Sequence, residues 1–252
     1  MSFKPKVALA QDFLLQLARL PVSVHSKVMK WAIQFQADPT SSSINYENIK
    51  GAKDPNLKSV RLNDDWRGIV FKPSAGDVYV LLYVDHHDDA YKWAERRKIE
   101  RHPTTGAMQL VEVRERVEEV EIFKPKEVAA TPAPVTKSAI RLFDNLRKFE
   151  LMAFGVPEEW VNDVRTATED SLFDIIEHLP QEAQEALLKL AVGEKPQPPE
   201  PVPAEADPFA HPDAQRRFRV LTNAEEQLRN AFLAASSQVF DQKAAALDQR
   251  IK

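Results

Sequence analysis

The feature that most constrains the fold is a set of three apolar runs joined by two short turns. The runs are Lys58–Leu62, Trp66–Lys72 and Val78–Val84, and all three contain the β-branched or aromatic residues that favour strands. The segments between them, Asn63–Asp65 and Pro73–Asp77, consist mainly of turn-forming residues. Connections this short join antiparallel neighbours, because parallel strands need a crossover of a dozen or more residues. The sequence therefore predicts a three-stranded antiparallel meander.

Further strand and helix patterns surround this meander. The apolar run Val7–Ala10 predicts a strand, and apolar residues at helical spacing predict helices over Phe13–Leu20 and Val24–Phe35. After the meander, Asp88–Glu100 has the spacing of another helix, whereas Met108–Ile122 fits either a strand or a helix. This order predicts an α+β fold in which two helices pack on an antiparallel sheet.

Proline marks the predicted domain boundaries. Seven of the eighteen prolines lie between residues 196 and 212, where the missing backbone donors favour an extended linker. A softer break lies at 124–138, and the segment between the two breaks combines helical apolar spacing with many carboxylates. The predicted organisation is a mixed domain at 1–123, a linker at 124–138, an acidic helical domain at 139–193, a Pro-rich linker at 194–212 and a C-terminal helical segment at 213–252.

The net charge of −4 is the sum of two parts of opposite charge. Residues 1–105 contain 16 Lys and Arg against 12 Asp and Glu, which gives +4, and the remaining residues contain 18 against 26, which gives −8. Within the second part, 151–200 alone holds 3 basic and 11 acidic residues. This asymmetry indicates either two parts with different partners or an ordinary solubilising surface. If the partners differ, we expect the acidic helices to contact a protein or to mask the basic part.

The composition excludes several kinds of chemistry. Without cysteine, the chain has no disulfide, no thiolate metal site and no cysteine nucleophile. Its six glycines are too scattered for a G-x-x-x-x-G-K-[ST] phosphate loop, so we expect no ATP hydrolysis, and no G-x-S-x-G elbow occurs. The densest group of metal-ligand types, His86–Asp89, lacks the spacing of a metal site, and neither a metal nor another cofactor is expected.

The apolar runs are too short to span a membrane. The N-terminal run Val7–Ala10 is interrupted by Gln11 and Asp12, which argues against a signal peptide. We therefore expect a cytoplasmic protein without a membrane partner.

Cations, histidines and a tyrosine gather between residues 58 and 97. The candidates for catalysis are His86, His87 and Tyr91, and those for nucleic-acid binding are Lys58, Arg61, Arg67, Arg96 and Arg97. In an antiparallel meander such residues can meet on one concave face, where cations stabilise a phosphate and a histidine transfers protons. The same cluster can instead hold a nucleic-acid backbone. In a third interpretation, the arginines pair with Asp64, Asp65 or Asp85 and the tyrosine packs in the core.

Three motifs within residues 3–105 resemble the RelE/ParE toxin superfamily. They are Phe13…Leu20-Pro21, the hairpin Val60–Leu62 with Trp66–Val70, and Val84–Tyr91. The hairpin is similar to an R-x-h…Y-R-h-h pattern, where h is hydrophobic and Trp66 replaces the usual Tyr, and the last motif is similar to V-x-H-x-x-x-h-Y. The resemblance implies a RelE-like fold. Members of this superfamily are ribosome-dependent mRNA endonucleases or gyrase inhibitors, and many are degenerate.

A second resemblance is to the N-terminal region of some UvrD/Rep-type superfamily 1 DNA helicases, which carry a RelE-like domain before the motor. It rests on His86–Arg97 and on His211–Val220 with the following Glu225-Glu226, and it extends over residues 1–230. No Walker loop follows, and Asn230–Lys252 is unlike the helicase continuation. The resemblance therefore implies a helicase relative without motor activity.

Three functional hypotheses follow. The favoured one is a non-motor accessory or regulatory protein whose RelE-like domain contacts RNA, DNA or a nucleic-acid machine. The second is a metal-independent mRNA endonuclease, in which the strand cations hold the scissile phosphate, His86 or His87 transfers protons and Tyr91 stacks on a base. The third is a ParE-type protein-interaction module without chemistry. Active toxins of this superfamily are short and strongly basic, whereas this chain is longer, acidic overall and rich in aspartate beside the histidines.

Overall fold

A computed structural model describes residues 5–114, 140–221 and 230 of the chain. The chain divides into two compact units, of which unit 1 comprises Met1–Val111 with Pro201–Lys252, and unit 2 comprises Glu112–Glu200. One boundary lies inside the predicted Pro-rich linker. The other boundary precedes the predicted linker 124–138, which lies outside the described residues. Most of the predicted helical segment 213–252 also lies outside them, and its described start is a helix only to Arg217, after which Phe218–Leu221 forms a strand.

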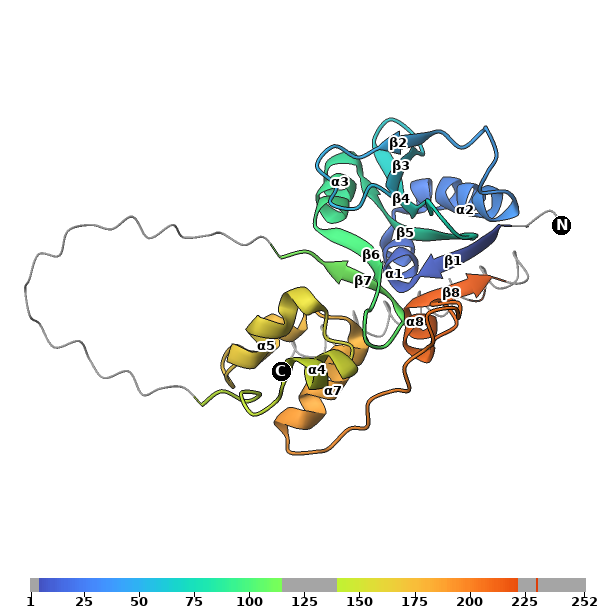
Figure 1. Cartoon of the computed structure of the whole chain (residues 1–252). Coiled ribbons are helices and arrows are strands. Elements are labelled where there is room, and N and C mark those ends of the chain that lie inside the picture. Colours follow the sequence, from blue (N-terminus) through green and yellow to red (C-terminus); the bar gives the residue numbers. More distant parts are fainter. Residues whose placement is uncertain (1–4, 115–139, 222–229, 231–252) are drawn as a thin grey trace, which may run out of the picture. The chain divides into compact units, whose positions relative to one another are not determined.

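Unit 1 is built on a six-stranded sheet with the order β2-β3-β4-β5-β1-β8 (Figure 1). Its elements are β1 Lys6–Ala10, α1 Gln11–Arg19, α2 Val22–Ala37, β2 Tyr46–Asn48, β3 Leu57–Arg61, β4 Trp66–Phe71, β5 Val78–His86, α3 His87–Glu95, β6 Arg97–Arg101, β7 Met108–Glu112, α8 Pro212–Arg217 and β8 Phe218–Leu221. The last residue of β7 belongs to unit 2. The fold is thus α+β with a mainly antiparallel sheet.

The predicted antiparallel meander is confirmed in β3, β4 and β5. Arg61 lies opposite Arg67 in the β3–β4 pair, Trp66 lies opposite His86 in the β4–β5 pair, and a bulge interrupts the second pair between Ile69 and Val70. The first strand is confirmed too. β1 pairs in parallel with β5 on one side and antiparallel with β8 on the other, as Figure 1 shows.

The helix predicted over Asp88–Glu100 is shorter in the structure. α3 ends at Glu95, and Arg97–Arg101 forms strand β6, which pairs with β7. Only Ile99 of this strand is buried, so its sequence carries little apolar periodicity of either kind. For Met108–Ile122 the sequence left strand and helix open, and the structure has a strand over Met108–Glu112. Residues 115–122 lie outside the described part of the chain.

Helices α1 and α2 cover one face of the sheet. Pro21 separates them, because proline has no N–H and clashes with the preceding helical turn. The core on this face contains Val7, Leu9, Phe13, Leu17, Val28, Ala32, Phe35, Val60, Trp66, Val70, Leu81, Val84 and Leu221. We call these residues the first core cluster.

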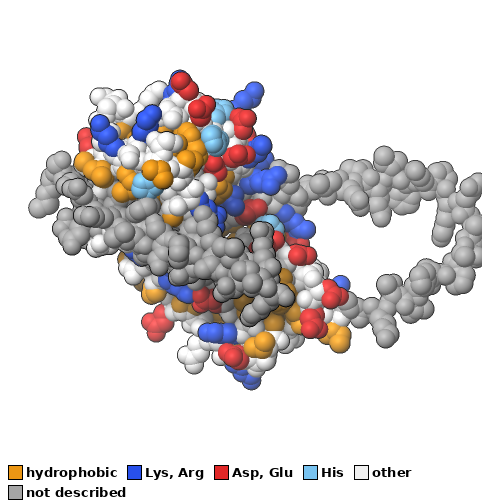
Figure 2. Space-filling view, turned by 180° about the vertical axis from the view of Figure 1, so that it is seen from behind, with side chains coloured by type: hydrophobic (Ala, Val, Ile, Leu, Met, Phe, Trp, Pro, Cys, Tyr) orange, Lys and Arg blue, Asp and Glu red, His pale blue; other side chains and the backbone are white. Residues whose placement is uncertain are grey.

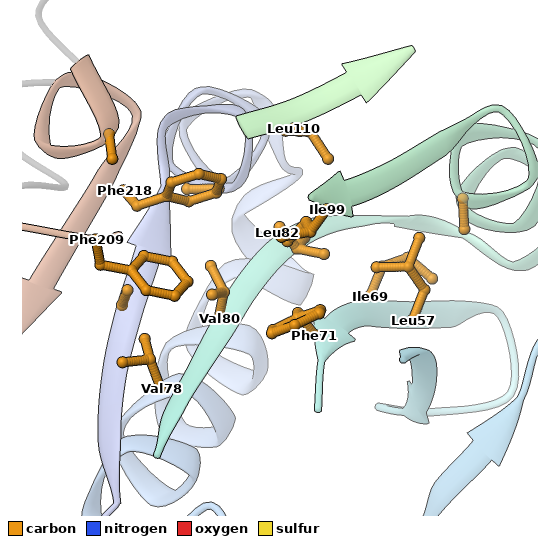
Figure 3. Close-up of a cluster of buried hydrophobic side chains, with 14 of the residues drawn as sticks. Leu57, Ile69, Phe71, Val78, Val80, Leu82, Ile99, Leu110, Phe209 and Phe218 are labelled. Atoms are coloured by element: carbon orange, nitrogen blue, oxygen red, sulfur yellow. The ribbon is translucent and has the colours of Figure 1, made fainter. Parts of the chain in front are cut away.

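The opposite face carries a second core cluster, to which the C-terminal segment contributes. Figure 3 shows Phe209 and Phe218 beside Val78 and Val80. The two phenyl rings pack edge to face with centroids 5.5 Å apart. Residues after Pro201 therefore form part of the unit 1 core.

The Pro-rich stretch contacts unit 1 through backbone groups as well. The Val202 amide donates to the Thr105 carbonyl at 2.9 Å, and the Arg101 guanidinium donates to the carbonyls of Pro203 and Ala204 at 2.6 Å each. Gly106, with a φ of 75°, lies against Val202, where a Cβ would collide with its carbonyl. These contacts hold the chain on unit 1 before α8 begins.

The described part of unit 2 is helical apart from the isolated bridge between Arg141 and Thr168. Its helices are α4 Lys148–Ala153, the 3₁₀ turn η1 Glu158–Trp160, α5 Val161–Thr166, α6 Leu172–Ile176 and α7 Gln181–Ala191. Trp160 anchors this unit, since Nε1 donates to the Glu112 carbonyl at 2.8 Å and the indole stacks on His178 at 5.3 Å. Among the described residues of the chain, no helix has the length and apolarity that crossing a membrane requires.

Candidate functional site

Arg67 is buried in the β3–β4 turn. Arg67 is only 8% exposed. Its Nη1 donates to the carbonyls of Asn63 at 2.8 Å and Trp66 at 3.1 Å. The Asn63 side chain closes the same turn by accepting from the Asp65 and Trp66 amides. The guanidinium that was predicted to hold a phosphate therefore satisfies backbone carbonyls of its own hairpin.

Arg61 lies opposite Arg67 in the ladder but is exposed. It forms an ion pair with Asp64 in the same turn, as the third interpretation of the cluster predicted. An exposed pair of this kind contributes little stability. It does, however, place a negative charge beside the cation that a phosphate would approach.

The two histidines lie where β5 passes into α3, and Tyr91 lies one helical turn further on. The His86 ring is exposed and packs on Trp66 with centroids 4.0 Å apart, while the His87 ring packs on Tyr91 at 4.3 Å. Tyr91 reaches across to β3, where its hydroxyl lies 3.0 Å from the Ser59 hydroxyl. His87 and Tyr91 thus lie together, with Tyr91 against the second core cluster. His86 instead packs on Trp66, which belongs to the first core cluster on the other face of the sheet.

His87 is oriented by a carboxylate. Its Nδ1 lies 2.8 Å from Asp88 Oδ1, and this hydrogen bond lowers the pKa of the Asp88 carboxyl. A histidine held through one ring nitrogen can exchange a proton at the other, so the arrangement can in principle support acid–base chemistry. Asp88 and Asp89 are both exposed at this end of α3, which makes the surroundings of the imidazole acidic.

Lys58 lies on the other face of the sheet. Side chains alternate along a strand, so Lys58 and Arg61, three residues apart, point to opposite faces. The Lys58 ammonium donates to Asn48 Oδ1 on β2 at 2.6 Å. On the same face, Lys72 lies over the Tyr46 ring with its ammonium 4.6 Å from the ring centroid. The structure therefore separates Lys58 from Arg61, Arg67 and Tyr91, whereas His86, opposite Trp66, lies on the same face as Lys58.

Arg96 and Arg97 lie at the far end of α3. Arg96 is exposed, whereas Arg97 is half-buried, with its guanidinium 4.8 Å from the Trp93 ring centroid and Nη1 donating to the Trp93 carbonyl at 3.2 Å. Trp93 in turn stacks on Tyr83 at 4.6 Å. Arg97 thus joins a packed aromatic group that is distinct from the histidines.

Sequence reasoning missed the polar group beside this aromatic stack. The Asp85 carboxylate accepts from Tyr83 Oη at 3.0 Å and from Gln16 Nε2 at 2.9 Å. Burial raises the pKa of Asp12, partly offset by the charges of Arg217 and Arg97, and burial together with Asp85 raises the pKa of Tyr83. These residues come from α1, β5, β6 and α8, so no local spacing in the sequence relates them.

Charges of both signs are mixed on the described surface that Figure 2 shows. On the side seen in Figure 2, described Lys and Arg side chains alternate with Asp, Glu and His side chains. Within the described residues, no group of three or more His, Cys, Asp and Glu side chains is placed to hold a metal ion. The group at the start of α3 therefore offers proton transfer, but its neighbouring cations are buried, ion-paired or on the opposite face.

Comparison with known proteins adds no assignment. Neither a protein-family model nor a curated protein sequence matches this chain.

Proposed function

We propose that this protein is a nucleic-acid-associated accessory protein whose unit 1 is RelE-like and binds nucleic acid without cleaving it. The order of elements supports a relationship to that superfamily, because a strand, two helices, an antiparallel meander and a helix follow one another as its motifs imply. The additional helical unit and the absent phosphate loop support an accessory role beside a nucleic-acid machine.

The observation that carries the non-catalytic part is the separation of three cations. Cleavage by a RelE-type mechanism needs cations and a proton-transfer group around one phosphate. In the structure Lys58 faces away from His87, Arg61 is paired with Asp64, and Arg67 is bound to carbonyls. The proton-transfer group is therefore present without the positive charge that would stabilise a pentavalent phosphate.

The binding part is tested with the purified full chain. Fluorescence anisotropy would be measured with labelled single-stranded RNA, single-stranded DNA and duplex DNA, at about 50 mM and about 200 mM salt. We expect binding that weakens with salt, because phosphate contacts release counterions. Failure to bind any of the three probes would overturn the proposal and leave a protein-interaction module of the ParE type.

The non-catalytic part is tested on the same samples. After prolonged incubation, denaturing gels should show intact RNA and DNA. Cleavage that survives repurification and disappears in His87→Ala would overturn this part and favour the endonuclease.

A further inference from the structure

The face of the sheet that carries Lys58 holds lysines beside tyrosines where the sheet ends at β2. We define the β2-edge surface as Tyr46, Asn48, Lys58, Lys72 and Tyr79. Alternation along the strands places these residues on the same face as the first core cluster, since Tyr46 lies opposite Val60 and Lys58 opposite Val70. All five are exposed or half-buried. Tyr79 lies on the inner strand β5 and is linked to the β2 edge through Phe35, on which both tyrosines pack.

The aromatic rings of this surface are fixed in position. Tyr46 and Tyr79 each pack edge to face on Phe35, with centroids 6.4 Å apart in both pairs. The Tyr46 hydroxyl donates to the Pro39 carbonyl, and burial raises the pKa of Tyr46, so the phenol remains neutral. A ring already held by its neighbours loses little conformational freedom when a ligand stacks on it.

Some other cations in the described part of unit 1 form ion pairs that these two lysines lack. Lys6, Arg61, Lys92 and Lys98 are ion-paired with carboxylates. Within the described residues, Lys58 and Lys72 have no carboxylate within ion-pair distance and instead contact an amide oxygen and a ring face. Their charges are therefore available to an anion at the cost of two weak contacts.

The charged groups near this surface include one carboxylate. Asp38 interacts with Tyr46 electrostatically, but its oxygen already accepts from the Thr40 amide at 2.9 Å and the Thr40 hydroxyl at 2.6 Å. Glu47 alternates with Tyr46 and Asn48 along β2 and so points to the opposite face. Lys50 and Lys53 are exposed in the connection from β2 to β3, but this connection packs against the second core cluster through Ile49 and Ala52, so it lies toward the other face. The balance at this edge is positive.

We propose that the β2-edge surface binds single-stranded nucleic acid. An unpaired base takes the place of the Lys72 ammonium over Tyr46, and the two ammonium groups then contact the flanking phosphates. Stacking requires an exposed base face, which a duplex does not offer, so single strands are preferred over duplexes. This inference rests on the proposed function and adds to it a place and a ligand class.

The test compares charge-matched variants of the full chain by fluorescence anisotropy. Lys58→Gln/Lys72→Gln removes the two cations of the surface, and Lys27→Gln/Lys30→Gln removes two exposed cations of α2. Single-stranded probes of about 12 nucleotides, one of RNA and one of DNA, and the DNA duplex would be used with each protein. The first variant should weaken single-strand binding about tenfold or more and reduce the salt slope by about 1.4, which is two phosphate contacts. The second variant should bind like the wild type.

The stacking partner is tested by two substitutions at Tyr46. Tyr46→Ala should weaken single-strand binding by about tenfold, the usual effect of losing one base–aromatic contact. Tyr46→Phe keeps the ring and should bind within about threefold of the wild type. Thermal unfolding monitored by circular dichroism identifies any loss of folding in Tyr46→Ala, in which case the lysine pair, at the surface, decides the matter.

The outcomes separate this inference from the proposed function. If the wild type binds single strands and both lysine variants bind equally well, the β2-edge surface is the wrong place although the proposed function stands. If duplex DNA binds as tightly as the single strands, the ligand class is wrong. If the wild type binds no probe, both the inference and the proposed function are overturned.

Discussion

The indole ring of Trp31 on α2 lies directly over the backbone of Gly68 on β4. A Cβ at Gly68 would lie 2.9 Å from Cζ3 of Trp31 and closer still to Cη2, nearer than real Cβ contacts come. Phe13 and Phe35 flank the half-buried indole, with centroids 6.2 Å and 5.8 Å away, and restrict its movement. The missing side chain at Gly68 therefore sets how closely α2 approaches the sheet.

Gly68→Ala should lower the free energy of unfolding of unit 1 by about 1–3 kcal/mol, the usual cost of overpacking a core. Urea denaturation of the full chain measures it. Replacing Trp31 by Phe removes the ring atoms in question, so Gly68→Ala should cost less in a Trp31→Phe background. An equal cost in both backgrounds would show that the close contact is not the cause.

Phe218→Ala should destabilise unit 1 by about 3–5 kcal/mol, because it removes a fully buried phenyl ring from the second core cluster. The matched control is Arg219→Ala, since the next residue of β8 is exposed and its loss should change stability by less than about 0.5 kcal/mol. Thermal unfolding of both variants gives the comparison. If both changes had the same small effect, the C-terminal segment would not belong to the core of unit 1.

The meander was predictable from sequence because its turns are too short for any other pairing. The distribution of its cations over two faces was also within reach, since Lys58 and Arg61 are three residues apart in a strand. The burial of Arg67 was not, because arginine in a strand next to a turn is ordinarily exposed. Its position depends on three-dimensional packing of the turn carbonyls around the guanidinium.

The pairing of β8 with β1 was beyond local sequence patterns. The two strands are separated by about 200 residues and by a whole helical unit, and β8 has only four residues. Proline content predicted an extended linker before α8, but it contains no information about the surface on which that chain packs. The polar group of Asp12, Tyr83 and Asp85 was missed for the same reason, because its members come from different elements.

Arg67→Ala should lower the free energy of unfolding by about 1–3 kcal/mol, because it removes the guanidinium donor from the Asn63 carbonyl, whereas the Trp66 carbonyl keeps the Leu62 amide. Arg61→Ala, which removes an exposed ion pair with Asp64, should change it by less than about 0.5 kcal/mol. Chemical denaturation of both variants is the measurement. A stable Arg67→Ala protein that had lost nucleic-acid binding would instead assign the guanidinium to the ligand.

Asp12→Asn should gain stability relative to the wild type as the pH rises. Burial raises the pKa of the Asp12 carboxyl, so its contribution to stability is complete below the unfolded pKa of about 3.9 and is lost as the pH rises through the folded pKa. Asparagine does not ionise, so its contribution to stability does not change as the pH rises. Free energies of unfolding would be measured for both proteins between about pH 3 and pH 7. The value for Asp12→Asn minus the value for the wild type should increase as the pH rises. A trend in favour of the wild type would mean that Arg217 and Arg97 outweigh burial.

Induced expression of the full chain in growing bacteria should leave growth and mRNA length unchanged. The reason is geometric: His87 and Asp88 can move a proton, but Lys58 lies on the other face and Arg67 is held by the turn. The informative comparison is His87→Ala, which removes the imidazole from an exposed position and should grow like the wild type. Arg67→Ala is a poor comparison, because the stability that it is expected to lose can lower activity whatever the role of the arginine. Growth arrest with shortened mRNA in the wild type, relieved by His87→Ala at equal protein level, would establish the endonuclease instead.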